Sequence, residues 1–137
     1  MTTEDVPPTK AWLLMGLTGS APGVLQVLDG RLIYAAHGRG ALTGGQVRRL
    51  EQRSGRAGLA DGLGAGDRVQ VLDVPVEKVK GVVFPWYYFG AGMKLTVGGS
   101  RYRFSFIKPQ NTQAEPAITA VPGSRASGRT WRDALGG

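Results

Sequence analysis

The segment Met93–Phe106, with the sequence MKLTVGGSRYRFSF, restricts the fold more than any other part of the chain. If Gly98 and Gly99 form a two-residue turn, the flanking residues pair so that one face is apolar and the other is polar. The apolar pairs are Leu95 with Tyr102 and Met93 with Phe104, and the polar pairs are Lys94 with Arg103 and Thr96 with Arg101. A shift of one residue would mix the two faces. The segment therefore predicts a half-buried hairpin within an antiparallel sheet.

A second hairpin is predicted around Asp29-Gly30, because this dipeptide is a strong signal for a tight turn between two strands. The flanking strands are Val24–Leu28 and Arg31–Ala36. Side chains alternate between the two faces of a strand, so the turn also predicts which residues share a face. The face that we expect to be buried carries Leu25, Val27, Leu32 and Tyr34.

Further segments have the apolar or alternating pattern of strands, and they are Ala11–Leu17, Arg68–Val74 and Val79–Phe84. With the two hairpins they give seven strand candidates, and no segment between them has the pattern of a helical crossover in a parallel sheet. Thr18–Gly23, TGSAPG, is predicted to be a turn. Residues 1–10 are expected to form a disordered leader, and residues 11–137 a single domain.

Residues 37–66 interrupt the strand pattern as a Gly/Arg-rich insertion after the third strand, with nine glycines. Thr43 and Gln46 have the spacing of a helix capping box, which predicts a short helix near residues 44–54. The rest of the insertion is expected to be a mobile loop. The insertion also carries a group of basic residues, namely Arg48, Arg49, Arg53 and Arg56.

A C-terminal helix is predicted over residues 124–135, SRASGRTWRDAL. Ser124 is placed to cap its first turn, and Trp131 and Leu135 lie four residues apart on one face. Seven antiparallel strands followed by one helix therefore describe the expected architecture.

This order of elements, over residues 11–135, resembles a pleckstrin-homology (PH) or GRAM-type domain. The segment Val82–Gly92, VVFPWYYFGAG, is also similar to small bacterial PH-like proteins. The resemblance implies a mainly β fold, a seven-stranded barrel of two antiparallel sheets with the helix across one open end. It further implies a non-enzymatic binding or scaffolding module. The polar N-terminus, which lacks the pattern of a signal peptide, and the absence of cysteine favour a location in the cytoplasm, where the protein could also lie at the periphery of a membrane. The implied partner is a protein, a peptide or an acidic membrane surface.

The PH domains that bind phosphoinositides carry basic residues on the first strand, on the loop after it and on the second strand. In this chain the expected loop, Thr18–Gly23, has no basic residue, and the nearest ones are Lys10 and Arg31. Phosphate recognition needs cationic or backbone donors that converge on one point. We therefore do not expect the lipid site of that subset at this loop.

A different basic patch is predicted on the polar face of the last hairpin, formed by Lys94, Arg101 and Arg103. Like charges directly opposite each other, as Lys94 and Arg103 are, cost about 0.2–1 kcal/mol, and an anionic partner would relieve this repulsion. These three residues are the candidates for binding an anion or a membrane, and the alternative is a solvated outer face. The arginines of the insertion have the same two interpretations.

The aromatic residues of PWYYFG, namely Trp86, Tyr87, Tyr88 and Phe89, are the candidates for an interaction patch. They cannot all point inward on a strand whose side chains alternate between faces. Exposed members would suit a partner protein, whereas core packing at a corner of the sheet is the alternative.

The chemistry available to the chain is limited by its residue types. It has no cysteine and a single histidine, His37, which excludes disulfides, thiolate zinc sites and any site that needs two histidines from one chain. Its carboxylates are scattered along the sequence. The sequence therefore predicts no catalytic residue, no cofactor and no metal site.

The net charge of +7 is concentrated in residues 67–110, which hold seven basic and three acidic side chains. Such an excess favours anionic partners, or it keeps a glycine-rich protein soluble. A nucleic-acid-associated protein is an alternative, but outward aromatic residues are not interleaved with the basic ones as stacking requires. A self-assembling structural protein is a second alternative, and homo-oligomers stay open. No apolar run approaches the roughly 18 residues of a membrane span, so the chain is not expected to be transmembrane.

Overall fold

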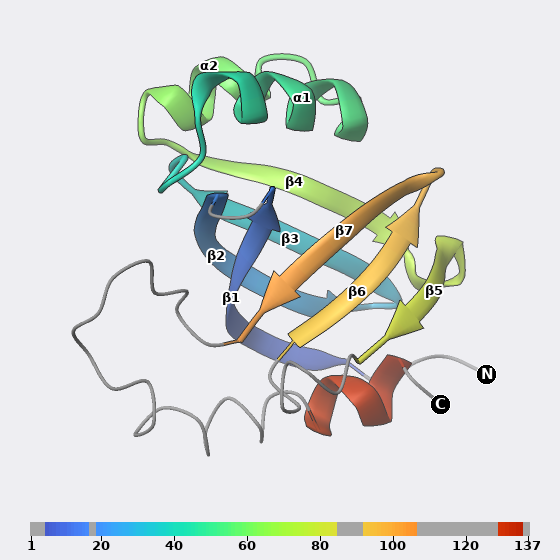
Figure 1. The fold of residues 1–137 in the computed structure, drawn as a ribbon. Coiled ribbons are helices and arrows are strands. Elements are labelled where there is room, and N and C mark those ends of the chain that lie inside the picture. Colours follow the sequence, from blue (N-terminus) through green and yellow to red (C-terminus); the bar gives the residue numbers. More distant parts are fainter. Residues whose placement is uncertain (1–4, 17–18, 85–91, 107–128, 136–137) are drawn as a thin grey trace.

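The computed structural model describes residues 5–16, 19–84, 92–106 and 129–135 (Figure 1). Seven strands form one antiparallel sheet in the order β4-β3-β2-β1-β7-β6-β5. The strands are β1 (Val6–Met15), β2 (Gly19–Leu28), β3 (Arg31–His37), β4 (Arg68–Pro75), β5 (Val79–Val83), β6 (Gly92–Val97) and β7 (Ser100–Ser105). The helices are α1 (Gly44–Ser54), α2 (Leu59–Gly64) and the short 3₁₀ helix η1 (Val76–Lys78). Residues 129–135 are also helical, and they lie at the opposite end of the sheet from α1 and α2 (Figure 1).

Both predicted hairpins are confirmed, each with its predicted register. The pairs in β6–β7 are Met93–Phe104, Lys94–Arg103, Leu95–Tyr102 and Thr96–Arg101. The pairs in β2–β3 are Leu25–Tyr34, Gln26–Ile33, Val27–Leu32 and Leu28–Arg31. Gly98 and Gly99 have φ values of +59° and +83°, as a two-residue turn with positive φ at both positions requires. The apolar face of each hairpin is buried, so alternation along the strands determines which face meets the core.

The sheet does not close into the expected barrel, because β4 and β5 are the two ends of the ladder. β1 lies in the middle and pairs with β7 only over residues 12–14. The sheet nevertheless folds over itself, since the ring of Tyr34 on β3 lies 4.9 Å from the ring of Phe104 on β7. Where β4 approaches the β6–β7 turn, the two line a cavity of about 130 Å³ together with Arg53 and Arg56.

Tyr34 lies at the centre of this core. Its hydroxyl group donates a hydrogen bond to the carbonyl oxygen of Ala21 at 2.9 Å, with the carbonyl oxygen of Ala11 at 3.3 Å. Burial raises the pKa of the Tyr34 phenol, because a phenolate would lose its hydration there. Gly23 on β2 lies against the same ring, and a Cβ at that position would meet the Tyr34 ring and the carbonyl oxygen of Ala35. The close approach of Tyr34 therefore requires glycine at position 23.

The predicted disordered leader is wrong for residues 6–10, because β1 begins at Val6. Val6 is buried and pairs with Val27 on β2. Pro7 and Pro8 fit into this strand because the register shifts between Val6 and Thr9, so the ladder does not need their missing N–H groups. The beginning of the chain therefore contributes to the core.

The predicted turn over Thr18–Gly23 is also wrong for most of its length. β2 begins at Gly19, and Ala21 is buried and pairs with Leu13 on β1. Residues 17 and 18 lie outside the described residues, and with them the last residue of the strand predicted over Ala11–Leu17. Glycine and alanine occupy the buried positions of this part of β2, so its composition resembles that of a turn.

The insertion at residues 37–66 contains two helices. The predicted helix is confirmed as α1, with a full capping box in which Thr43 and Gln46 exchange side-chain and backbone hydrogen bonds of 3.0 and 3.1 Å. The mobile loop expected after it is wrong where α2 forms, with Leu59 and Leu63 buried. Glu51 on α1 accepts a hydrogen bond of 2.9 Å from the backbone N–H of the second residue of α2. Tertiary contacts therefore stabilise a helix too short to form alone.

The predicted C-terminal helix is present over residues 129–135, whereas Ser124 and the start of the prediction lie outside the described residues. Trp131 is fully buried, its ring stacks on Phe106 at 6.4 Å, and its Nε1 donates to the Thr9 hydroxyl oxygen at 3.2 Å. Leu135 on the same face packs against the core. The helix is thus docked on the sheet through Trp131.

Candidate anion-binding site

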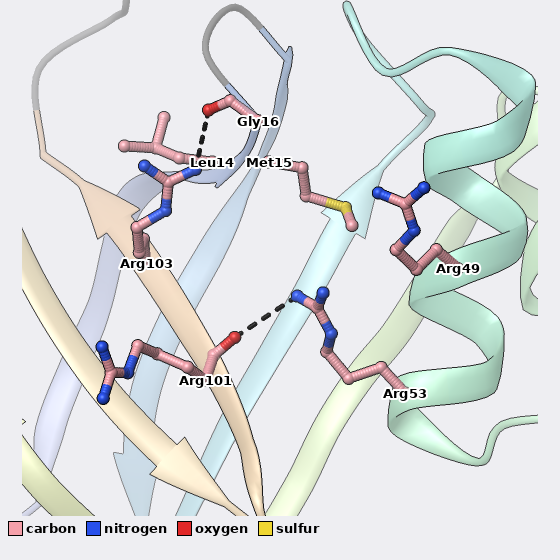
Figure 2. A pocket seen from close by; sticks show the side chains of 7 residues that line it. All are labelled: Leu14, Met15, Gly16, Arg49, Arg53, Arg101 and Arg103. Carbon is pink, nitrogen blue, oxygen red and sulfur yellow. Dashed lines mark hydrogen bonds between the residues drawn. The ribbon is translucent and has the colours of Figure 1, made fainter.

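A cavity of about 220 Å³ lies between α1, β7 and the end of β1 (Figure 2). We call it the arginine pocket. Its lining residues are Leu14, Met15, Gly16, Arg49, Arg53, Arg101 and Arg103. The pocket thus combines four arginines with one apolar wall, and its lining contains no carboxylate among the residues that the structure describes.

The two arginines from α1 reach the pocket because they lie four residues apart on one side of the helix. Val47 and Leu50 are buried under α1, which leaves Arg49 and Arg53 exposed on another side. α1 is held beside the β1–β2 turn by Gln46, whose Nε2 donates to the carbonyl oxygen of Met15 at 3.3 Å. The helix therefore cannot turn its arginines away without breaking this contact.

Glycine at the β1–β2 turn allows this close approach. Gly16 has a φ of +63°, and a Cβ there would come within 2.9 Å of the Gln46 amide. A Cβ at Gly19 would also meet that amide. Gly16 and Gly19 therefore pack closely against the first turn of α1.

The two arginines from β7 reach the pocket because they alternate with the buried residues Tyr102 and Phe104. Arg103 donates from Nη2 to the carbonyl oxygen of Gly16 at 2.8 Å. Arg53 donates from Nη1 to the carbonyl oxygen of Arg101 at 3.3 Å. These two hydrogen bonds join the three walls of the pocket, β7 to the β1–β2 turn and α1 to β7 (Figure 2).

The four arginines do not point in the same way. Figure 2 shows the guanidinium groups of Arg49, Arg53 and Arg103 around the side chain of Met15. The side chain of Arg101 extends away from Arg53, and only its carbonyl oxygen faces that residue (Figure 2). The guanidinium groups of Arg49 and Arg53 therefore lie on one side of Met15, that of Arg103 lies on its other side beside Gly16, and Arg101 lies at the rim of the pocket (Figure 2).

No described acidic side chain pairs with the arginines of the pocket. Within the described part of the chain, one ion pair is formed, between Nε of Arg31 on β3 and Oδ1 of Asp73 on β4, at 2.6 Å. It includes none of the pocket arginines. Tyr102 lies next to Arg53, and burial raises its pKa, while the charge of Arg53 lowers it. Because burial is the larger cause, Tyr102 stays neutral near pH 7 and offers no negative charge. Within the described ranges, therefore, none of the pocket arginines forms an ion pair with an acidic side chain.

The structure places the predicted site residues in different positions. Lys94 faces Arg103 across the ladder, as predicted, but it does not line the pocket. Arg101 and Arg103 line it together with the α1 arginines, which are about fifty residues away in sequence. Trp86, Tyr87, Tyr88 and Phe89 lie outside the described residues.

The arginines of the insertion do not form one basic surface. Arg48 lines a separate cavity of about 380 Å³ between α1 and α2, together with Arg39, Glu51 and Asp61. Arg56 lines the small cavity beside β4. Of this group, only Arg49 and Arg53 line the arginine pocket, and no sequence pattern indicated which two would do so. The periodicity of α1 separates Arg48 from Arg49, but the position of the helix relative to β7 depends on tertiary contacts.

The described residues offer little else that could act as a chemical site. Among them, no group of three or more His, Cys, Asp or Glu side chains is placed to hold a metal ion. No helix formed by these residues combines the length and apolar character needed to cross a bilayer. Comparison with known protein families, with curated proteins and with solved structures finds no match for the chain.

Proposed function

We propose that this protein is a non-enzymatic binding module of the PH/GRAM-like type that attaches to an acidic membrane surface through the arginine pocket. The observation that carries the proposal is that arginines from α1 and β7 line one pocket, with no carboxylate among its described lining residues. Arginine is suited to such a role because its planar guanidinium group binds phosphate and carboxylate with two hydrogen bonds. Each basic residue near an anionic leaflet contributes about 1 kcal/mol.

The PH-like part of the proposal is supported by the topology. β1 lies between two runs of neighbouring strands, β2–β4 on one side and β7–β5 on the other. The C-terminal helix packs Trp131 against the core at the end of the sheet away from α1. A division into two sheets, as in PH domains, would follow from the fold-over that brings Tyr34 to Phe104.

Co-sedimentation with vesicles tests the proposal. Neutral and acidic vesicles are compared at low and at physiological salt, and we expect binding to acidic vesicles that weakens as salt rises. The variant R49Q/R53Q should weaken that binding roughly 30-fold, which corresponds to about 2 kcal/mol for two arginines. Charge reversal at Arg101 and Arg103 should weaken it without unfolding the domain.

The matched control is R39Q/R48Q, which removes the same charge from the cavity between α1 and α2. It should retain most of the binding. Equal losses in the two double variants would mean that only net charge matters, and no binding to acidic vesicles at either salt would reject the membrane as the partner. The protein or peptide alternative would then be favoured.

A further inference from the structure

We propose that the arginine pocket is a specific site for a phosphomonoester, a terminal phosphate group that carries close to two negative charges near neutral pH. This inference deepens the proposed function by naming the ligand chemistry, and it rests on that function only for the choice of a membrane as the source. A lipid headgroup and a small soluble phosphate ester share this chemistry. The pocket, and not the overall charge of the protein, would select the phosphomonoester over other anions.

The hydrogen-bond donors of the pocket are positioned but not used up. Arg103 and Arg53 each use a donor on a backbone carbonyl oxygen, at 2.8 and 3.3 Å, and these bonds fix the positions of their guanidinium groups. A guanidinium group has five N–H donors, so both arginines retain donors for a ligand. Arg49 adds a further guanidinium group from α1, on the same side of Met15 as Arg53 (Figure 2). Positioned donors lose less conformational entropy when the ligand binds.

The number of guanidinium groups favours a phosphomonoester over a phosphodiester. A terminal phosphate presents three oxygen acceptors and a charge between about −1.5 and −2 at pH 7. A phosphodiester presents two such oxygens and a single charge. Arg49 and Arg53 place two positive charges on one side of Met15, and no carboxylate lines the pocket among the described residues. A dianion therefore neutralises more of this charge than a singly charged diester does.

The size of the pocket agrees with this assignment. Sites for drug-sized ligands are clefts of roughly 300–1,000 Å³. The arginine pocket, at about 220 Å³, is smaller and is suited to a phosphate group and the first atoms attached to it. Leu14 and Met15 form an apolar wall that could contact the carbon atoms next to the ester oxygen.

The dependence on pH separates the two ester classes. The second pKa of a phosphomonoester is about 6, whereas a phosphodiester does not titrate between pH 5 and 8. Among the described residues, the ionisable groups that line the pocket are all arginines, a residue type that does not lose its proton in proteins. Tyr102, next to Arg53, stays neutral because burial raises its pKa. A gain in affinity between pH 5 and 7.5 would therefore come from the ligand.

Isothermal titration of the full chain with two soluble probes, glycerol 3-phosphate and dimethyl phosphate, tests the inference. At pH 7.5 and equal ionic strength, we expect glycerol 3-phosphate to bind at least tenfold more tightly, and to lose that advantage at pH 5. R49Q should lower its affinity at least fivefold, and the adjacent control R48Q should leave it unchanged. Thermal melts of both variants confirm that they are folded.

Vesicles that contain phosphatidic acid or phosphatidylglycerol at matched surface charge identify the source. Tighter binding to phosphatidic acid, abolished by R49Q/R53Q, supports the inference together with the membrane function. Binding of glycerol 3-phosphate without binding to any vesicle supports the inference and rejects the membrane. Equal binding to both vesicle types through the pocket, or equal binding of both probes at every pH, overturns the inference and leaves the membrane function in place. Tighter binding of a phosphoserine peptide than of phosphatidic acid vesicles would assign the phosphate to a protein partner and reject the lipid source.

Discussion

The β6–β7 hairpin and the α1–α2 insertion each provide one wall of the arginine pocket, but they are held in different ways. The hairpin is bonded along its length, is joined to β1, and packs Met93, Leu95 and Phe104 into the core. α1 rests on Val47 and Leu50 and is tied to the sheet by hydrogen bonds from Gln46 and Arg53. The hairpin is thus a fixed wall, whereas α1 depends on a few contacts for its position.

This difference has a consequence for binding. A ligand that bridges arginines from both walls would add contacts between the insertion and the sheet, and these contacts would stabilise the less firmly held wall more than the other. The pocket is therefore expected to be sensitive to changes in α1 that leave the sheet intact. Changes in the hairpin core, by contrast, should unfold the whole domain.

Phe104→Ala should have the largest effect, because it removes a fully buried side chain from the fixed wall and from its contact with Tyr34. Truncation of a buried phenylalanine costs about 3–5 kcal/mol. Denaturant unfolding followed by circular dichroism measures this loss. A loss below about 1 kcal/mol would contradict the central position that we assign to the hairpin.

Tyr34→Phe should have an intermediate effect, a loss of roughly 1–2 kcal/mol, because it removes the hydroxyl group that bonds to the carbonyl oxygen of Ala21. The folded pKa of Tyr34 lies above its unfolded value of 10.0, so folding is not penalised below pH 10 and loses stability as the pH rises above it. The substitution should reduce the slope of stability against pH between pH 10 and 11. Unfolding at several alkaline pH values measures that slope, and an unchanged slope would assign it to other groups.

Gln46→Ala should have the smallest effect on global stability, about 1 kcal/mol, because it removes half of the capping box and the bond to Met15. Its effect should be local. Hydrogen exchange should become faster in α1, whereas exchange in β6 and β7 stays unchanged. Equal acceleration in both regions would show that the insertion and the sheet unfold as one unit, which would remove the distinction between the two walls.

The sequence allowed the hairpins to be predicted with their registers, because alternation and the glycine turns are local features. The capping box of Thr43 and Gln46 predicted α1 for the same reason. α2 was missed because it contains Gly62 and Gly64, and its stability comes from buried leucines and from Glu51 on another helix. The first part of β2 was missed because its buried positions hold only glycine and alanine.

The candidate site was predicted only in halves. Arg101 and Arg103 were identified from the hairpin, and the arginines of the insertion were recognised as a separate basic group. Their meeting depends on the contact of Gln46 with Met15 and on the space left by Gly16 and Gly19. Neither the contact between Gln46 and Met15 nor the space at the two glycines can be recognised from a local sequence pattern. A site formed between distant segments therefore required the tertiary structure.

A double-mutant cycle tests most directly the central claim that α1 and β7 form one site. The affinity for glycerol 3-phosphate is measured for the wild type, R49Q, R103Q and R49Q/R103Q, with the pair R48Q and R103Q as a control cycle. If both arginines contact one phosphate, the double variant should lose clearly less affinity than the product of the two single losses, because either change already removes much of the site. Purely multiplicative losses in both cycles would contradict the claim and would describe two independent basic surfaces.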